Sequence, residues 1–335
     1  MPGSRFAGNV IAITMAGWLF CAQAGDTLLG SRGLKAFEEA SSLSLSGRHR
    51  AADSFARSWD EGSEQEKLLL SATVALSAFA DLHDPSRLES AHRSLDQLSR
   101  LVRSRTDPRS RLIDAMALSQ ASYLAALEGR DLASALDGRS AASVAQDMMD
   151  QGWDSPELRG IVGGYLFWKS QTLGPLGRLI GGDQRDRGLR LTQQAAASRS
   201  PFREAFRTSL LWIRYERGDY AEALRVVQEA RATWPENRLY RQAEGDVLFR
   251  LDRLPQALDT YRASFREYEG LEVLPVGRLS AAGNLARIQA AMGRPDSARA
   301  WLDTLDAPRY GKVRKWLPAS LVRDLVPVRR KMSHP

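Results

Sequence analysis

Apolar residues recur every three or four positions along most of the chain. Between residues 64 and 82, for example, one series with this spacing is Leu68, Leu69, Ala72, Leu76 and Phe79. This spacing places the apolar side chains on one face of an α-helix. Capping residues, glycine and proline divide the stripes into segments of helical length, and no strand-like alternation of β-branched residues occurs. The pattern therefore predicts an all-α protein that is built from antiparallel helical hairpins.

Two stretches of the sequence show the same helix–turn–helix pattern 34 residues apart. RYERGDYAEAL spans residues 214–224, and FRLDRLPQALD spans residues 249–259. Ala223 and Ala257 take equivalent positions, where a small side chain lets two helices cross closely. A repeat of this length indicates hairpins that cannot bury their apolar faces alone and therefore stack on one another. The fold is thus predicted to be an α-solenoid.

Residues 204–264 resemble two tetratricopeptide repeats, and residues 279–305 resemble a third. The first copy carries the residues typical of that family at Gly218, Tyr220, Ala223, Val227, Ala230 and Pro235. The second copy has Asp252 in place of the turn glycine and lacks the closing proline. The resemblance implies a superhelix in which the first helix of each hairpin lines a concave face, and it implies that this face holds a peptide or a protein segment.

The register of the repeats predicts which side chains line the concave face. The predicted partner-binding residues are Thr208, Trp212, Tyr215, Gln242, Asp246, Phe249, Arg250 and Arg287. The alternative for the tryptophan and the phenylalanine is core packing, and the alternative for the two arginines is a solvated surface. Thr208 and Trp212 stand where the family's clamp for acidic chain ends has its first members, so a clamp of that kind is not expected.

The first 24 residues have the three parts of a secretory signal. A short basic end is followed by the uncharged residues 6–21, and Ala22-Gln23-Ala24 forms a cleavage site before Gly25. We therefore expect export and a periplasmic or extracytoplasmic location, with an uncleaved N-terminal membrane anchor as the alternative. The expected organisation is a signal peptide at 1–24, an irregular hairpin region at 25–200, tetratricopeptide-like repeats at 201–306 and a basic C-terminal segment at 307–335.

The positive charge of the chain is concentrated near its C-terminus. The whole sequence carries a net charge of +7, and residues 307–335 alone contain eight bases and one acid, Asp324. Apolar residues among these bases predict an amphipathic helix that caps the last repeat. They are Trp316, Leu317, Leu321, Val322 and Leu325. The alternative is contact with an anionic membrane or a cell-wall polymer. Nucleic acid is not an expected partner of an exported protein.

Residues that carry catalysis or bind metals are sparse. Cys21 is the single cysteine, and the four histidines lack the spacing of a zinc motif. We therefore expect no catalytic residue, no metal site and no cofactor. The apolar, glycine-punctuated segment 173–182 is predicted to be a loop, which either folds over neighbouring helices or touches a membrane or a partner.

These features favour a non-enzymatic interaction scaffold of the bacterial cell envelope that binds a protein or peptide on its concave face. The first alternative is a membrane-associated adaptor that uses the loop 173–182 and the tail 307–335. The second alternative is an enzyme with an α-helical cleft, which no motif supports.

Overall fold

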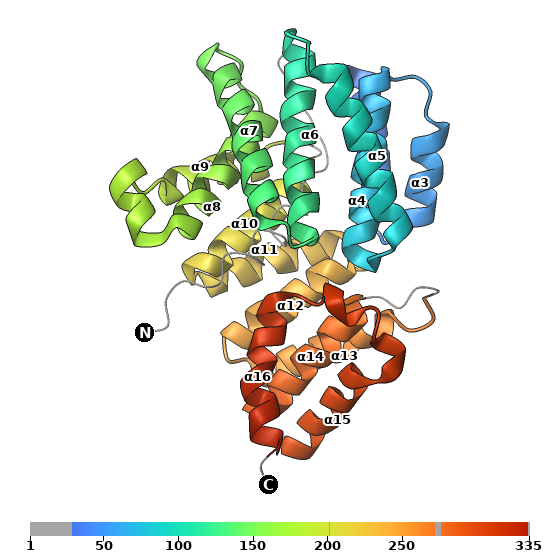
Figure 1. Ribbon diagram of the computed structural model, residues 1–335, viewed down its shortest axis with the longest axis vertical. Helices are drawn as coiled ribbons and strands as arrows, with labels where there is room; N and C mark the ends of the chain where they lie inside the picture. The colour runs from blue at the N-terminus through green and yellow to red at the C-terminus, as the bar shows by residue number, and fades with distance from the viewer. Residues whose placement is uncertain (1–28, 201, 272–275, 334–335) are drawn as a thin grey trace. The chain divides into compact units, whose positions relative to one another are not determined.

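The computed structural model describes residues 29–200, 202–271 and 276–333 (Figure 1). These residues form fifteen α-helices and two short 3-10 helices, and none of them forms a strand. The fold is an all-α solenoid of helical hairpins, as the hydrophobic pattern predicts. It divides into two compact units. Unit 1 comprises the described residues up to Ala78 together with Pro85–Arg217, and unit 2 comprises Phe79–Asp84 and Gly218–Pro335.

Unit 1 consists of helices that pack against their neighbours in the sequence, such as α6 on α7 and α8 on α9. α4 belongs to unit 1 except for its last turn, which belongs to unit 2. The helices are α2 (Ser31–Leu45), α3 (His49–Ser58), α4 (Glu64–Leu82), α5 (Pro85–Val102), α6 (Pro108–Leu127), α7 (Asp131–Asp150), α8 (Pro156–Gly181), α9 (Arg185–Ala196) and α10 (Arg203–Arg217).

Short polar side chains determine where several of these helices begin. Before α4, the Ser63 backbone N–H donates to Glu66 Oε2 (2.9 Å) and the Glu66 backbone N–H donates to Ser63 Oγ (3.3 Å). Before α6, Asp107 Oδ1 accepts a hydrogen bond from the Ser110 backbone N–H (2.9 Å). These bonds satisfy amide groups that the first turn of a helix leaves without partners. The helix starts are therefore encoded locally.

Glycines bring α8 close to the two helices that follow it. A Cβ atom on Gly163 would lie 2.9 Å from the backbone oxygen of Gly188 on α9. A Cβ atom on Gly160 would lie 2.1 Å from the ring of Phe206 on α10. Both distances are too short for an unmoved Cβ, so only glycine fits at these two contacts.

The segment that was predicted to be an apolar loop is helical. α8 continues through residues 173–181 and ends at Gly181, and Gly182 follows with a φ of 70°. Each glycine in a helix costs about 1 kcal/mol relative to alanine. The apolar residues of this segment nevertheless keep a spacing of three and four, which favours continuation of the helix. The prediction of a loop at 173–182 is therefore wrong.

Unit 2 contains the stretches with the clearest repeat pattern. Ala223, Ala257 and Ala298 are fully buried in its hairpins, which explains why these positions are small. The helices are α11 (Tyr220–Thr233), α12 (Arg238–Arg250), α13 (Leu254–Glu267), α14 (Val276–Ala291), α15 (Pro295–Asp306), the 3-10 helices η1 (Pro308–Tyr310) and η2 (Arg314–Trp316), and α16 (Ala319–Ser333).

One backbone conformation recurs at hairpin turns in both units. Gly218 and Gly293 have φ values of 83° and 71°, and Asp252 adopts the same left-handed region with a φ of 57°. In unit 1, Gly47 before α3 and Gly129 before α7 have φ values of 70° and 73°. This region suits glycine and ends a helix cleanly. The irregular half of the chain therefore keeps the hairpin turn of the repeats although it has lost their spacing.

The division into two units falls at a different place from the predicted domain boundaries. The two units separate after Arg217, so α10 and α11, which form the first predicted repeat, belong to different units. The boundaries at residues 200 and 306 stay predictions. The predicted signal peptide at 1–24 lies outside the described residues.

The basic C-terminal segment ends in α16, which packs on α14 and α15. Leu321 and Leu325 are buried there in an apolar cluster with Leu279 and Leu302. Val322 was predicted to lie on the same face, but it is 48% exposed. It follows Leu321 by one position, which is about 100° of helical rotation, so it lies outside the buried stripe. That part of the prediction is wrong.

We expect Gly163→Ala to lower the free energy of unfolding of unit 1 by about 1–3 kcal/mol, because the new methyl group would overlap the backbone of α9. Gly164→Ala is the matched control on the same helix. A Cβ atom there would lie 3.9 Å from Ser209 Oγ, so the change should be neutral or stabilising by up to about 1 kcal/mol. Urea denaturation followed by circular dichroism measures both values, and equal stabilities would contradict the close packing of α8 on α9.

Candidate functional site

Four of the eight predicted groove residues are neighbours in unit 2. Asp246, Phe249 and Arg250 lie in the second half of α12, and Arg287 lies on α14. The Arg287 guanidinium is 4.5 Å from the centre of the Phe249 ring. Both arginines act electrostatically on the Asp246 carboxyl. We call these four residues the α12–α14 face. Their proximity follows from the contacts, and their role in binding stays a prediction.

Asp246 is held by a tyrosine from the next helix. The Tyr261 hydroxyl donates to Asp246 Oδ1 at 2.7 Å. Gly245 makes room for this tyrosine, because a Cβ atom at that position would lie 2.6 Å from the Tyr261 ring. Burial raises the pKa of Asp246, and the Tyr261 hydrogen bond and the charges of Arg287 and Arg250 offset part of that rise. The carboxyl group is therefore a fixed, internally satisfied element of the face.

The two arginines of the face differ in what they offer to a partner. Arg287 Nη1 donates to Asn284 Oδ1 (3.0 Å) and lies 3.2 Å from Asp324 Oδ2 on α16. Its charge is therefore matched by the chain's own carboxylate. Arg250 is exposed, and its guanidinium lies 5.5 Å from the centre of the Tyr220 ring. Arg250 is thus the more exposed of the two arginines.

Gln242 lies one turn before Asp246 on α12 and takes part in a different network. Its Nε2 donates to Tyr268 Oη (3.0 Å), and that hydroxyl donates to Asp81 Oδ1 (3.1 Å). Asp81 also pairs with Arg238, whose Nε donates to it at 3.0 Å. The amide of Gln242 is therefore used in holding the end of α4 within unit 2.

The three predicted groove residues of unit 1 lie on α10. Thr208 Oγ1 donates to the Glu204 backbone oxygen (2.9 Å), and Trp212 is only 7% exposed. The Trp212 and Tyr215 rings meet edge to face with centroids 5.4 Å apart. Trp212 is therefore a core-packing residue, which is the alternative given for it above. Tyr215 is the partly exposed member of the pair. The binding role of these three residues stays a prediction.

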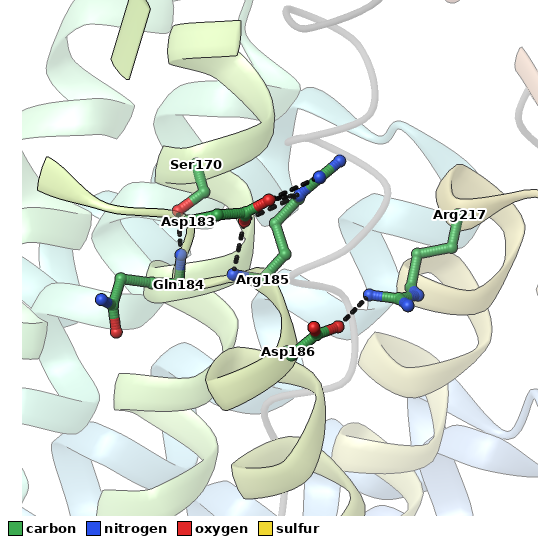
Figure 2. A network of polar contacts seen from close by, with 6 residues as sticks. All are labelled: Ser170, Asp183, Gln184, Arg185, Asp186 and Arg217. Carbon is green, nitrogen blue, oxygen red and sulfur yellow. Dashed lines mark hydrogen bonds and ion pairs between the residues drawn. The ribbon is translucent and has the colours of Figure 1, made fainter. Parts of the chain in front are cut away.

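Figure 2 shows a second polar network, in unit 1 around the start of α9. Arg185 pairs with Asp183 (2.6 Å), and Arg217 pairs with Asp186 (2.6 Å). The Ser170 hydroxyl accepts a hydrogen bond from the Gln184 backbone N–H (3.3 Å). Ion pairs of this exposure contribute about 0–1 kcal/mol each. The network therefore fastens the α8–α9 connection and presents no unmatched pair of carboxylates for chemistry.

The part of the chain that the structure describes contains no candidate metal site and no candidate membrane-spanning helix. Its histidine, cysteine, aspartate and glutamate side chains form no group of three that could hold a metal ion. None of its helices combines the length and the apolar content needed to cross a bilayer.

The comparisons with known proteins agree with this architecture. Residues 279–304, within α14 and α15, match the sequence model of the tetratricopeptide repeat. The crystal structure of NprR in complex with its cognate peptide NprX is similar with a TM-score of 0.51 at 12% identity, over 93% of this chain and 87% of NprR. The chain has a tetratricopeptide-repeat fold. At this identity the similarity to NprR concerns the fold alone.

Other comparisons add little to the tetratricopeptide-repeat assignment. A human IFIT1 dimer with PPP-AAAA aligns with 97% of this chain and 80% of its own at 14% identity. Its TM-score is 0.35, which carries no structural argument. No curated protein matches the sequence.

The sequence pattern did not indicate two residues that bind the α12–α14 face. Asn284 and Asp324 both bind Arg287, but they lie on α14 and on the C-terminal α16. Asn284 stands three positions before Arg287 on α14, and residues at this spacing are neighbours on one face of a helix. Asp324 lies beyond the paired helices of the hairpins, and the repeat register contains no information about that helix. The available signal for Asp324 is that it is the single acid among the bases of residues 307–335.

We expect the stability of unit 2 to fall as the pH drops from about 6.5 to about 4. His83 follows α4 with a φ of 52°, and its ring packs on Phe79 and Trp316. Burial lowers the pKa of His83 to about 4, and the charge of Asp81 opposes that shift. The unfolded chain takes up the proton first, near pH 6.5, so acidification favours unfolding by at most about 3 kcal/mol.

Chemical denaturation at pH 7.0, 5.5 and 4.5 measures this effect. The control is His83→Asn, which removes the titrating group, and asparagine tolerates the left-handed backbone that this position requires. The difference between the two proteins isolates the histidine from the carboxyl groups that titrate in the same range. An unchanged pH dependence in His83→Asn would contradict the assignment.

Proposed function

We propose that the chain is a non-enzymatic interaction scaffold that holds a peptide or an extended protein segment on the α12–α14 face. The observation that carries the proposal is the exposed Arg250, which follows Phe249 in α12. The Arg287 guanidinium lies 4.5 Å from the centre of the Phe249 ring, and the charges of both arginines act on Asp246. The tetratricopeptide-repeat fold supports it, and so does the similarity to NprR, whose structure was solved with a peptide.

The chemistry of the face suggests which segment it would hold. A guanidinium presents several donors in a fixed plane and matches a carboxylate with two parallel hydrogen bonds. The Arg250 side chain is exposed, and the Arg287 guanidinium lies 3.2 Å from Asp324 Oδ2 on the inner side of α16. We therefore propose a segment with an acidic side chain or a terminal carboxylate that reaches Arg250, and with an apolar group next to it that packs near Phe249.

We further propose that the protein is exported and acts in the bacterial cell envelope. The support is the sequence of residues 1–24, which has a basic end, an uncharged apolar run and the Ala22-Gln23-Ala24 site. A scaffold in that compartment would meet envelope proteins or their extended termini.

A photo-reactive phenylalanine derivative at position 249, which keeps Arg250, should cross-link to a partner in intact cells. The matched control carries the same amino acid at position 265, because Phe265 is also a half-buried phenylalanine of unit 2 but lies on α13. We expect a discrete cross-linked band from position 249 and a much weaker one from position 265. Addition of free Arg250→Ala protein should compete less well for the band than addition of the Arg266→Ala protein.

Equal cross-linking at the two positions would show that contact with the α12–α14 face is not specific. Absence of any band from position 249, with the protein folded and present at normal levels, would overturn the proposed binding face.

The mass of the purified mature protein tests the proposed export. We expect a chain that begins at Gly25, because cleavage would follow Ala24. Ala24→Arg is the variant that should block cleavage, since signal peptidases require a small residue at that position. A mature protein that retains residues 1–24 in wild-type cells would favour the alternative of an N-terminal anchor.

A further inference from the structure

One side of α16 packs against the rest of unit 2, and the opposite side is exposed. The two sides differ in their residue types. Leu321, Leu325 and Met332 point inward and are buried. The exposed residues between them in the sequence form the outer face of α16. Its chemically informative members are Val322, Arg323, Val326, Arg330 and Lys331.

Two valines make the outer face of α16 more apolar than the end of a solenoid needs to be. Val322 and Val326 are 48% and 43% exposed, and they lie one turn apart on the same stripe. The terminal helix of a repeat array usually turns polar residues toward water. Among the side chains that the structure describes, five large hydrophobic residues are at least 37% exposed, and two of them are these valines.

The charge of the outer face is of one sign. Arg330 and Lys331 are exposed about one turn after Val326, and Arg323 is exposed beside Val322. The single acid of residues 307–335 is Asp324, and its carboxylate lies 3.2 Å from the Arg287 guanidinium on α14. The acid is therefore used on the inner side, and the outer side presents bases and valines.

We propose that the outer face of α16 docks on an anionic lipid bilayer. Arginine and lysine side chains are long enough to reach phosphate groups while short apolar side chains next to them enter the boundary of the acyl region. Each base held near such a surface strengthens binding about fivefold. The outer face carries no carboxylate and no amide side chain that would give it specificity for a protein surface.

This lipid contact is independent of peptide binding on the α12–α14 face. Asp324 and Arg287 meet on the inner side of α16, whereas the valines and the exposed bases lie on its outer side. A scaffold could therefore hold a protein segment while it rests on a membrane. The contact also needs no apolar loop at 173–182, which the helical structure of that segment excludes.

Vesicle flotation of the full-length protein tests the proposal. The probes are vesicles of equal parts phosphatidylglycerol and phosphatidylcholine, and vesicles of phosphatidylcholine alone. We expect the ratio of binding to the two kinds of vesicle to fall at least tenfold in Arg330→Glu/Lys331→Glu. In Val322→Ser/Val326→Ser we expect the same ratio to fall about threefold to tenfold. Use of the ratio removes any contribution of the apolar residues 6–21, which would bind both kinds of vesicle.

The matched control is Arg253→Glu/Arg294→Glu, which changes the net charge by the same amount at two exposed arginines of unit 2 outside α16. It should keep the wild-type ratio. Circular dichroism should show unchanged melting, because all the altered side chains are exposed. The proposal is overturned if wild-type protein prefers neither kind of vesicle, or if the control loses as much binding as the α16 variant. It is also overturned if soluble poly-glutamate, but not the anionic vesicle, binds at the valines and bases of α16.

Discussion

The buried ion pair between Asp81 and Arg238 is the interaction on which unit 2 depends. Arg238 opens α12, and Asp81 lies in the last turn of α4, 157 residues earlier in the chain. Both side chains are mostly buried. Loss of one partner of such a pair usually costs 3–5 kcal/mol, because the other charge stays buried without compensation. Tyr268, which follows α13, and Gln242 on α12 extend the pair into a larger network. The helix that carries the α12–α14 face is thereby held at its first turns.

The face itself shows how a solenoid divides its polar residues between structure and recognition. Tyr261 holds Asp246, and Asp324 and Asn284 hold Arg287. These bonds satisfy groups that would otherwise be buried at a cost of about 1–3 kcal/mol each. Arg250 is the exposed cation of this arrangement, and it is the group that the proposed partner would contact. A rigid, internally bonded base with a few exposed donors is the arrangement that peptide recognition requires.

The hairpin turns of the repeats also occur in unit 1, where the sequence no longer keeps the 34-residue spacing. The turn before α7 uses Gly129 with the left-handed backbone that Gly218 uses before α11. The turn before α13 achieves the same backbone with Asp252, at some conformational cost. Turn geometry is therefore kept more strictly than the spacing of the repeats. The reason is that the turn fixes the antiparallel packing of a hairpin, whereas insertions between hairpins are tolerated.

The sequence by itself determined the all-α class, the hairpin repeats, the crossing alanines and the proximity of Asp246 and Phe249 on one helix. These features depend on helical periodicity and on neighbours in the chain, which the order of residues specifies directly. Only the tertiary structure decided that Asp324 forms an ion pair with Arg287, that Trp212 is buried and that Val322 faces outward. The position of a residue in its own helix gives the direction of its side chain around the axis. Which surface that side chain then meets depends on how distant helices pack, and a single sequence does not contain that information.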